Sequence, residues 1–107
     1  MKFNVTILKH AKEDINDIFD YVLMSDKIEN AEKIIKNIEK VIRSLSNLPN
    51  RGHNPPELER IGITDFKEIH DYPYRIIYRI IDNNVFIHGV FDSRRNLSEL
   101  LEKRLLR

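Results

Sequence analysis

The sequence from Asp71 to Arg95, DYPYRIIYRIIDNNVFIHGVFDSRR, decides the fold of this chain. Two runs rich in β-branched and aromatic residues, 74–81 and 85–92, flank the segment Asp82-Asn83-Asn84. Such runs are typical of strands, and short polar side chains tolerate the geometry of a tight turn. The pattern therefore predicts a β-hairpin.

The predicted first strand has two different faces, because side chains alternate along a strand. One face carries Tyr74, Ile76, Tyr78 and Ile80, and the other carries Arg75, Ile77, Arg79 and Ile81. The hairpin region contains four arginines, Arg75, Arg79, Arg94 and Arg95. Guanidinium groups form charge-assisted hydrogen bonds with carboxylates and phosphates, so this concentration indicates an anion or an acidic partner.

Residues 2–48 are predicted to form one strand and two helices. Apolar and polar residues alternate over 2–8, as in a half-buried strand, and apolar residues recur at helical spacing over 11–22 and over 31–48. Asp26 and Glu29 have the spacing of a capping box before the second helix. The short connection favours an antiparallel helical hairpin on one sheet face. The charged sides of both helices, Asp14 included, are expected to face solvent.

The second half of the chain adds a loop, a short strand and a terminal helix. Residues 49–62 include Pro55-Pro56 and are predicted to form a loop without a helix, on which Glu57 and Glu59 are solvated charges. Residues 65–70 form a strand that leads to the hairpin. Asn96 and Glu99 then resemble a helix cap, and a stripe of leucines marks the terminal helix: Leu97, Leu100, Leu101 and Leu105. The stripe fits either a permanent core or a displaceable segment.

The predicted fold class is α+β with the order β-α-α-β-β-β-α. It consists of a twisted, mainly antiparallel sheet with a helical hairpin on one face and a C-terminal helix. At 107 residues the chain is predicted to be one domain, residues 1–107. It has no cysteine and no apolar run long enough to cross a bilayer, so a cytoplasmic location without membrane contact is expected. No cofactor and no metal are predicted, because the four histidines do not fall at ligand intervals on one element.

The basic residues are concentrated in the last third of the chain. Residues 75–107 contain 7 lysines and arginines against 4 acidic residues, whereas residues 1–74 contain 11 against 13. The formal net charge of the whole chain is only +1. A local anionic contact at the C-terminal end is therefore more consistent with the sequence than a general nucleic-acid surface.

The motifs of the chain resemble a known superfamily. The predicted element order, the LPNRGH loop of residues 48–53, the PYRIIYRI strand of residues 73–80 and the VFDSRR strand end of residues 90–95 together resemble the RelE/ParE superfamily of bacterial type II toxin–antitoxin toxins. The resemblance covers nearly the whole chain. The pattern RRxLxxLLxxRL, which starts at Arg94, is similar to the ParE or plasmid-stabilisation branch.

The resemblance implies a growth-inhibiting toxin that a cognate antitoxin neutralises in a hetero-oligomer. ParE-like members poison DNA gyrase, whereas RelE-like members cut messenger RNA in the ribosome. Many active RelE-like members offer a tyrosine or histidine where this chain has Phe91-Asp92-Ser93. This difference favours inhibition of gyrase. The alternatives are a ribosome-dependent endoribonuclease that uses Arg75, Arg79 and Asp92, and an inactive relative that only binds antitoxin.

The residues expected to contact a target or an antitoxin are Arg75, Arg79, Arg94, Arg95, Leu97 and Leu101. Each candidate also has a structural interpretation. Arg75 and Arg79 fit ion pairs with carboxylates such as Glu68 that hold the sheet together. Tyr72, Tyr74 and Tyr78 fit base stacking or the apolar core. His70 and His88 fit titrating groups or strand residues with ordinary hydrogen bonds.

Overall fold

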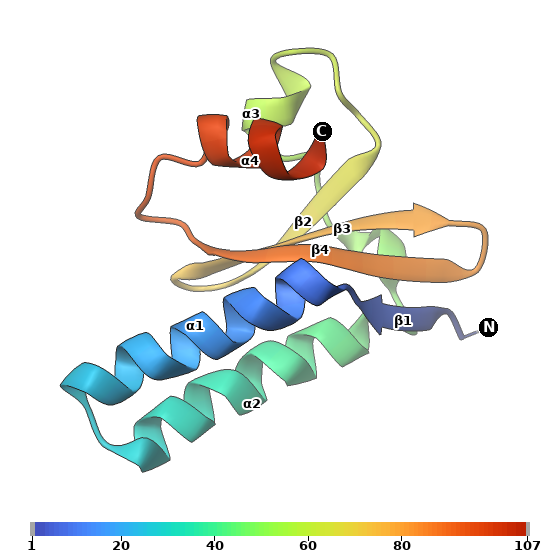
Figure 1. Ribbon diagram of the computed structural model, residues 1–107. Coiled ribbons are helices and arrows are strands. Elements are labelled where there is room, and N and C mark those ends of the chain that lie inside the picture. Colours follow the sequence, from blue (N-terminus) through green and yellow to red (C-terminus); the bar gives the residue numbers. More distant parts are fainter. Residues whose placement is uncertain (1, 107) are drawn as a thin grey trace.

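The computed structural model describes residues 2–106 and contains a four-stranded sheet with helices on both faces (Figure 1). The strands are β1 (Asn4–Ile7), β2 (Phe66–Asp71), β3 (Tyr74–Ile81) and β4 (Asn84–Asp92), in the spatial order β1-β4-β3-β2. β1 is parallel to β4, and the other two neighbouring pairs are antiparallel. The predicted α+β class, element order and mainly antiparallel sheet are confirmed.

The central hairpin of β3 and β4 turns through Asp82 and Asn83. Asp82 has a φ of 55°, in the left-handed region that Asp and Asn tolerate better than most residues. Asn84 was expected in the turn but begins β4. The register contains a bulge, because Ile77 pairs with Gly89 while Tyr78 pairs with Ile87, so that His88 is the additional residue on β4.

The helical hairpin covers one face of the sheet (Figure 1). It consists of α1 (Lys9–Ser25) and α2 (Ile28–Ser44). Their apolar sides and the sheet form a core whose buried members include Ala11, Ile15, Ile38, Ile42, Leu45, Tyr74, Ile76 and Tyr78. The face of β3 that carries Tyr74, Ile76 and Tyr78 therefore packs against the helical hairpin. Within residues 2–106, none of the helices combines the length and apolar character that spanning a bilayer requires.

The opposite face of the sheet is covered by α3 (Pro56–Glu59) and α4 (Ser98–Leu105). Leu97 and Leu101 are 1% and 0% exposed and belong to a second core, whose other buried members are Leu58, Phe66, Ile77 and Phe91. The terminal leucine stripe is thus core in this structure. The amide of Ser98 donates a hydrogen bond of 3.2 Å to the Asn96 side-chain oxygen, but Leu97 occupies the N-cap position of α4, so the expected Asn96–Glu99 cap is formed only in its Asn96 part.

The prediction that residues 49–62 contain no helix is wrong. A 3-10 turn, η1 (Pro49–Arg51), and the single turn α3 both begin with proline. Proline is tolerated at the start of a helix because the first amide groups have no intrahelical acceptor. The second long helix also ends at Ser44 instead of Leu48, and the first strand is shorter than residues 2–8.

The predicted capping box before α2 is not formed. The Asp26 carboxylate accepts hydrogen bonds from the Lys27 amide (2.7 Å) and from the Asn30 side chain (2.8 Å), and α2 begins only at Ile28. These bonds lower the pKa of Asp26, the Lys27 amide having the larger effect. Asp26 therefore stabilises the connection between the helices through Asn30 instead of through Glu29.

Tyr78 joins the sheet to the segment that follows α2. Its side chain is fully buried, and its hydroxyl donates to the Pro49 carbonyl (2.6 Å) and accepts from the Gly52 amide (3.2 Å). A Cβ atom at Gly52 would collide with this hydroxyl and would lie 2.7 Å from the Glu68 carbonyl oxygen. Tyr74 and Tyr78 are core residues, whereas Tyr72 is 83% exposed.

We expect Tyr78→Phe to destabilise the fold, because the Pro49 carbonyl and the Gly52 amide lose their shared partner. Leaving such buried groups unpaired costs about 1–3 kcal/mol. Urea unfolding at pH 7 measures the change, and Tyr72→Phe is the matched control on an exposed side chain. Equal unfolding midpoints for the two variants would show that the hydroxyl contributes nothing to stability.

Candidate functional site

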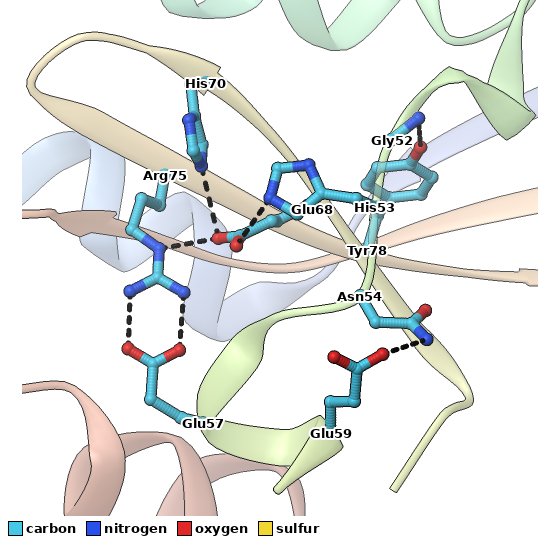
Figure 2. A network of polar contacts seen from close by, with 9 residues as sticks. All are labelled: Gly52, His53, Asn54, Glu57, Glu59, Glu68, His70, Arg75 and Tyr78. Atoms are coloured by element: carbon cyan, nitrogen blue, oxygen red, sulfur yellow. Dashed lines mark hydrogen bonds and ion pairs between the residues drawn. The ribbon is translucent and has the colours of Figure 1, made fainter.

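A buried ion-pair network lies on the sheet face that carries α3 and α4 (Figure 2). Glu68 on β2 and Arg75 on β3 have side chains that are only 2% and 10% exposed. Arg75 Nε donates a hydrogen bond of 2.5 Å to Glu68 Oε1. Its two terminal nitrogens each donate a bond of 2.7 Å to the two carboxylate oxygens of Glu57 on α3. All three nitrogens of the Arg75 guanidinium are therefore engaged with carboxylates.

Two histidines flank the Glu68 carboxylate. His53 Nε2 lies 3.1 Å from Oε2, and His70 Nε2 lies 3.4 Å from Oε1. His53 reaches this position because its backbone forms an isolated bridge with Glu68, through bonds of 3.1 and 2.7 Å. His70 is on the same face as Glu68, two residues along β2. The Glu68 carboxylate of β2 thus contacts the segment before α3, through His53, and β3, through Arg75. Arg75 in turn links this carboxylate to Glu57 on α3.

The network sets the charge states of its members. The Arg75 hydrogen bonds hold the pKa of Glu57 below its ordinary value of 4.5, against the opposing effect of burial. In turn, Glu57 chiefly, together with Glu68, raises the pKa of Arg75, so that the guanidinium stays charged. A charged guanidinium held by two carboxylates has little capacity left for a further anion.

Arg79 and His88 lie farther along the same face, around Phe66. The Arg79 guanidinium is 5.4 Å from the centre of the Phe66 ring, and the His88 ring meets Phe66 edge-on at 5.2 Å. Among residues 2–106, no hydrogen-bond partner is found for the buried atoms Arg79 Nε and His88 Nε2. Burial first, and then Arg79 and Arg104, lower the pKa of His88, so its neutral form is favoured.

Asp92, Arg94 and Arg95 lie at the end of β4. Asp92 accepts hydrogen bonds from Arg94 Nε (2.9 Å) and Nη2 (2.6 Å), and these bonds lower the pKa of Asp92. Arg94 and Arg95 are exposed. In the register, Asp92 faces Tyr74 and Arg75 faces Phe91, so the side chains of Asp92 and Arg75 leave opposite faces of the sheet. The structure therefore does not bring Arg75, Arg79 and Asp92 together.

A cleft of about 600 Å³ opens beside Asp92, between α1, the end of β4 and α4. Its lining combines the aromatic rings of Tyr21 and Tyr74 with charged groups that include Asp92, Arg95 and Arg104. At its inner wall, Arg104 forms two hydrogen bonds with Asp14, of 2.9 and 3.1 Å. The expectation that Asp14 faces solvent is wrong, because this carboxylate joins α1 to α4 and also accepts the Val90 amide.

Sequence reasoning proposed the Arg75–Glu68 pair as one alternative and missed the roles of Glu57 and His53. Glu57 was expected to be a solvated loop charge, but it is half-buried against Arg75. His53 contacts Glu68 on β2, and the spacing of residues along a single element cannot reveal such a contact. The signal available in the sequence was Pro56 directly before Glu57, since proline is common at the first position of a helix and so permits a helical turn here.

The sequence matches a known protein family and a known toxin. The family described as "ParE toxin of type II toxin-antitoxin system, parDE" matches residues 5–97. A curated relative, Toxin ParE3 of Caulobacter vibrioides, is 29% identical over 91 residues, which cover 85% of this chain and 87% of the relative.

Two solved structures have the same fold at low sequence identity. A chromosomal ParDE toxin–antitoxin system from P. aeruginosa matches with a TM-score of 0.71 and 16% identity, over 85% of this chain and 96% of that chain. A mutant of the E. coli toxin RelE in the free state matches with a TM-score of 0.67 and 16% identity, over 100% of this chain and 98% of that chain. These two likenesses concern the fold alone.

We expect Glu57→Gln to destabilise the protein at pH 7 by about 1.5–3 kcal/mol, the range for hydrogen bonds to a charged group. The pKa of Glu57 is lower in the folded state than in the unfolded chain. Its stabilising effect is therefore complete above the ordinary pKa and is lost as the pH falls through the lowered value.

Urea unfolding of both proteins between pH 7 and pH 3 tests this dependence. The difference between wild type and Glu57→Gln should shrink towards the acid end of the range. Glu59→Gln is the matched control, because Glu59 is exposed and its contact is a 3.4 Å bond with Asn54. A difference that stays constant with pH would contradict a role for the ionised Glu57 carboxylate.

Proposed function

Because the chain belongs to the ParE toxin family of type II toxin–antitoxin systems, we propose that it arrests growth by inhibiting DNA gyrase in the cytoplasm. The observation that supports this proposal is the family match over residues 5–97, which includes β2, β3, β4, both long helices and β1 from its second residue onward. The fold does not choose the target, since ParDE and RelE structures are matched with similar scores.

The charge arrangement weighs against the ribonuclease alternative. RNA cleavage at the 2′-hydroxyl needs a base near neutral pKa and cationic groups that stabilise a phosphorane-like transition state. Asp92 has a lowered pKa, which makes it a weak base, and Arg75 is neutralised by two carboxylates. Of the proposed catalytic residues, Arg79 retains an unpaired Nε among the described residues, but it lies against Phe66.

Among the predicted contact residues, the exposed cations that fit an acidic or phosphate surface are Arg94 and Arg95. Both lie at the end of β4, and Arg95 also lines the cleft. The other predicted contact residues, Arg75, Arg79, Leu97 and Leu101, lie on the α3 and α4 face, where Leu97 and Leu101 are buried. A partner could reach the buried leucines only if α4 left the sheet. It could contact Arg94 and Arg95 without any movement of a helix, because both are exposed.

We expect purified toxin to produce cleaved plasmid DNA with gyrase covalently attached and to leave messages intact in a reconstituted translation reaction. The Arg94→Ala/Arg95→Ala double variant should weaken DNA cleavage by at least about tenfold, which corresponds to 1.4 kcal/mol of lost contact energy. The matched control is Arg43→Ala/Arg60→Ala, which removes the same charge from exposed positions on other elements.

The same pair of assays tests the alternative. Ribosome-dependent, codon-positioned cleavage that disappears in Asp92→Asn would overturn the proposal and support an endoribonuclease. Inactivity in both assays, with antitoxin binding intact, would support the inactive relative.

The cleft between α1 and α4 is the proposed docking place of the cognate antitoxin. Tyr21, which lines the cleft, is 70% exposed, and Met24, three residues farther along α1, is 86% exposed. Arg95 adds a cation for an acidic side chain of the partner. An amphipathic helix with aromatic-binding and acidic positions fits this combination.

We expect hydrogen exchange to slow along α1 and the end of β4 when the coexpressed antitoxin is bound. Tyr21→Ala should raise the Kd by about tenfold or more, since aromatic anchors at interfaces carry at least 1–2 kcal/mol. Tyr72→Ala is the control, because Tyr72 is also exposed but does not line the cleft. Protection confined to the exposed side of α2 would place the antitoxin elsewhere.

A further inference from the structure

The cluster of His53, Glu68 and His70 has a geometry that neither the family nor the proposed target explains. Each residue offers one ligand atom, and these atoms all lie within 4.8 Å of one another. In Figure 2 the two imidazole rings approach the Glu68 carboxylate from its two sides. The rings are 5.3 Å apart and nearly perpendicular, at 86°, so they do not stack on each other.

Two of the separations in this cluster lie near those of a metal shell, and the ligand atoms of all three residues lie within 4.8 Å of one another. Ligand atoms about 2.0–2.2 Å from a tetrahedral zinc ion lie about 3.2–3.6 Å from each other. His53 Nε2 is 3.1 Å from one Glu68 oxygen, and His70 Nε2 is 3.4 Å from the other. Two imidazole nitrogens and a carboxylate are also a donor set that divalent transition metals prefer. Only small movements of exposed side chains are needed to close the shell.

The local charge favours a cation in spite of Arg75. The guanidinium is shared by two carboxylates, Glu57 and Glu68, which leaves one negative charge in excess. Arg75 contacts only Oε1 of Glu68, and His53 faces Oε2. Arg75 therefore orients the carboxylate through Oε1, the oxygen that also faces His70, and leaves Oε2 free for His53, in the way that outer groups hold metal ligands. Glu57 neutralises the Arg75 guanidinium.

The cluster is both accessible and fixed in position. The side chains of His53 and His70 are 60% and 50% exposed, whereas that of Glu68 is 2% exposed. An ion can thus enter from solvent, and water can complete its coordination. Backbone hydrogen bonds between His53 and Glu68 hold these two ligands at a set distance before any ion arrives. A site that is already assembled loses little conformational entropy when it binds.

We propose that His53 Nε2, His70 Nε2 and the Glu68 carboxylate form a binding site for a divalent transition-metal ion of the Zn²⁺ class. Both imidazoles bind through the unprotonated nitrogen. The ion links the segment before α3 to the outer strand β2, and it draws on the same carboxylate that holds Arg75. This proposal is independent of the target of the toxin.

Isothermal titration of the full chain with Zn²⁺ alone tests the site. We expect one ion per chain, and an increase in Kd of at least about tenfold in each of His53→Gln and His70→Gln, since weakening even an outer-layer contact costs 10–100-fold. These two residues are the test positions because they are exposed, so their variants should fold. Glu68 is left intact because it also holds Arg75.

His10→Gln and His88→Gln are the controls. His10 pairs with Glu13 on α1. Apart from the two contacts of Glu68, this pair is the histidine–carboxylate contact found among the described residues. Both controls should keep the wild-type Kd, and nitrogen NMR should show Zn²⁺-dependent shifts only at Nε2 of His53 and His70. Absence of saturable binding, an unchanged Kd in the two test variants, or loss of binding in His10→Gln would each overturn the proposal.

Discussion

The buried carboxylate of Glu68 is the constraint on which the packing of α3, and of the segment before it, against β2 and β3 depends. An ionised carboxylate that is 2% exposed would cost several kcal/mol without compensating partners. Arg75 supplies a charged donor across the strand pair, and two imidazoles supply further contacts. Because these partners come from separate segments, satisfying one charge also positions the loop before α3 against the sheet. Glu57 then completes the coordination of Arg75, which fixes α3 as well.

The two faces of β3 impose a second constraint. Its apolar residues enter two different cores, one under the helical hairpin and one under α3 and α4. A strand buried on both faces leaves no solvent-facing side for charges, so its arginines must be paired or must lie on aromatic rings. Arg75 takes the first solution and Arg79 the second. The bulge at His88 adjusts the register between these positions and the strand end.

The elements that periodicity describes could be predicted from the sequence, and the contacts between distant segments could not. The faces of β3, the helical hairpin and the terminal helix depend on local patterns of period 2 or 3.6. The partners of Arg75 depend on the distance between α3 and β3, which local patterns do not contain. The sequence pattern predicts a solvated Glu57 because two adjacent prolines predict a loop, whereas Pro56 occupies the first position of α3. Local patterns do not reveal the contacts of His53 either, since its neighbours Glu68 and His70 lie on β2.

Four arginines in one hairpin therefore do not make one anion site. Arg75 neutralises internal carboxylates, Arg79 covers an aromatic ring, and Arg94 pairs with Asp92. Their count along the sequence overestimates the positive charge that a partner meets, because three of the four are used within the protein. Of the four, Arg95 has no such internal ion pair among residues 2–106, and it is exposed and lines a cleft with aromatic walls. ParDE and RelE structures both match this fold at 16% identity, so the backbone alone does not specify which charged side chains are presented at the surface.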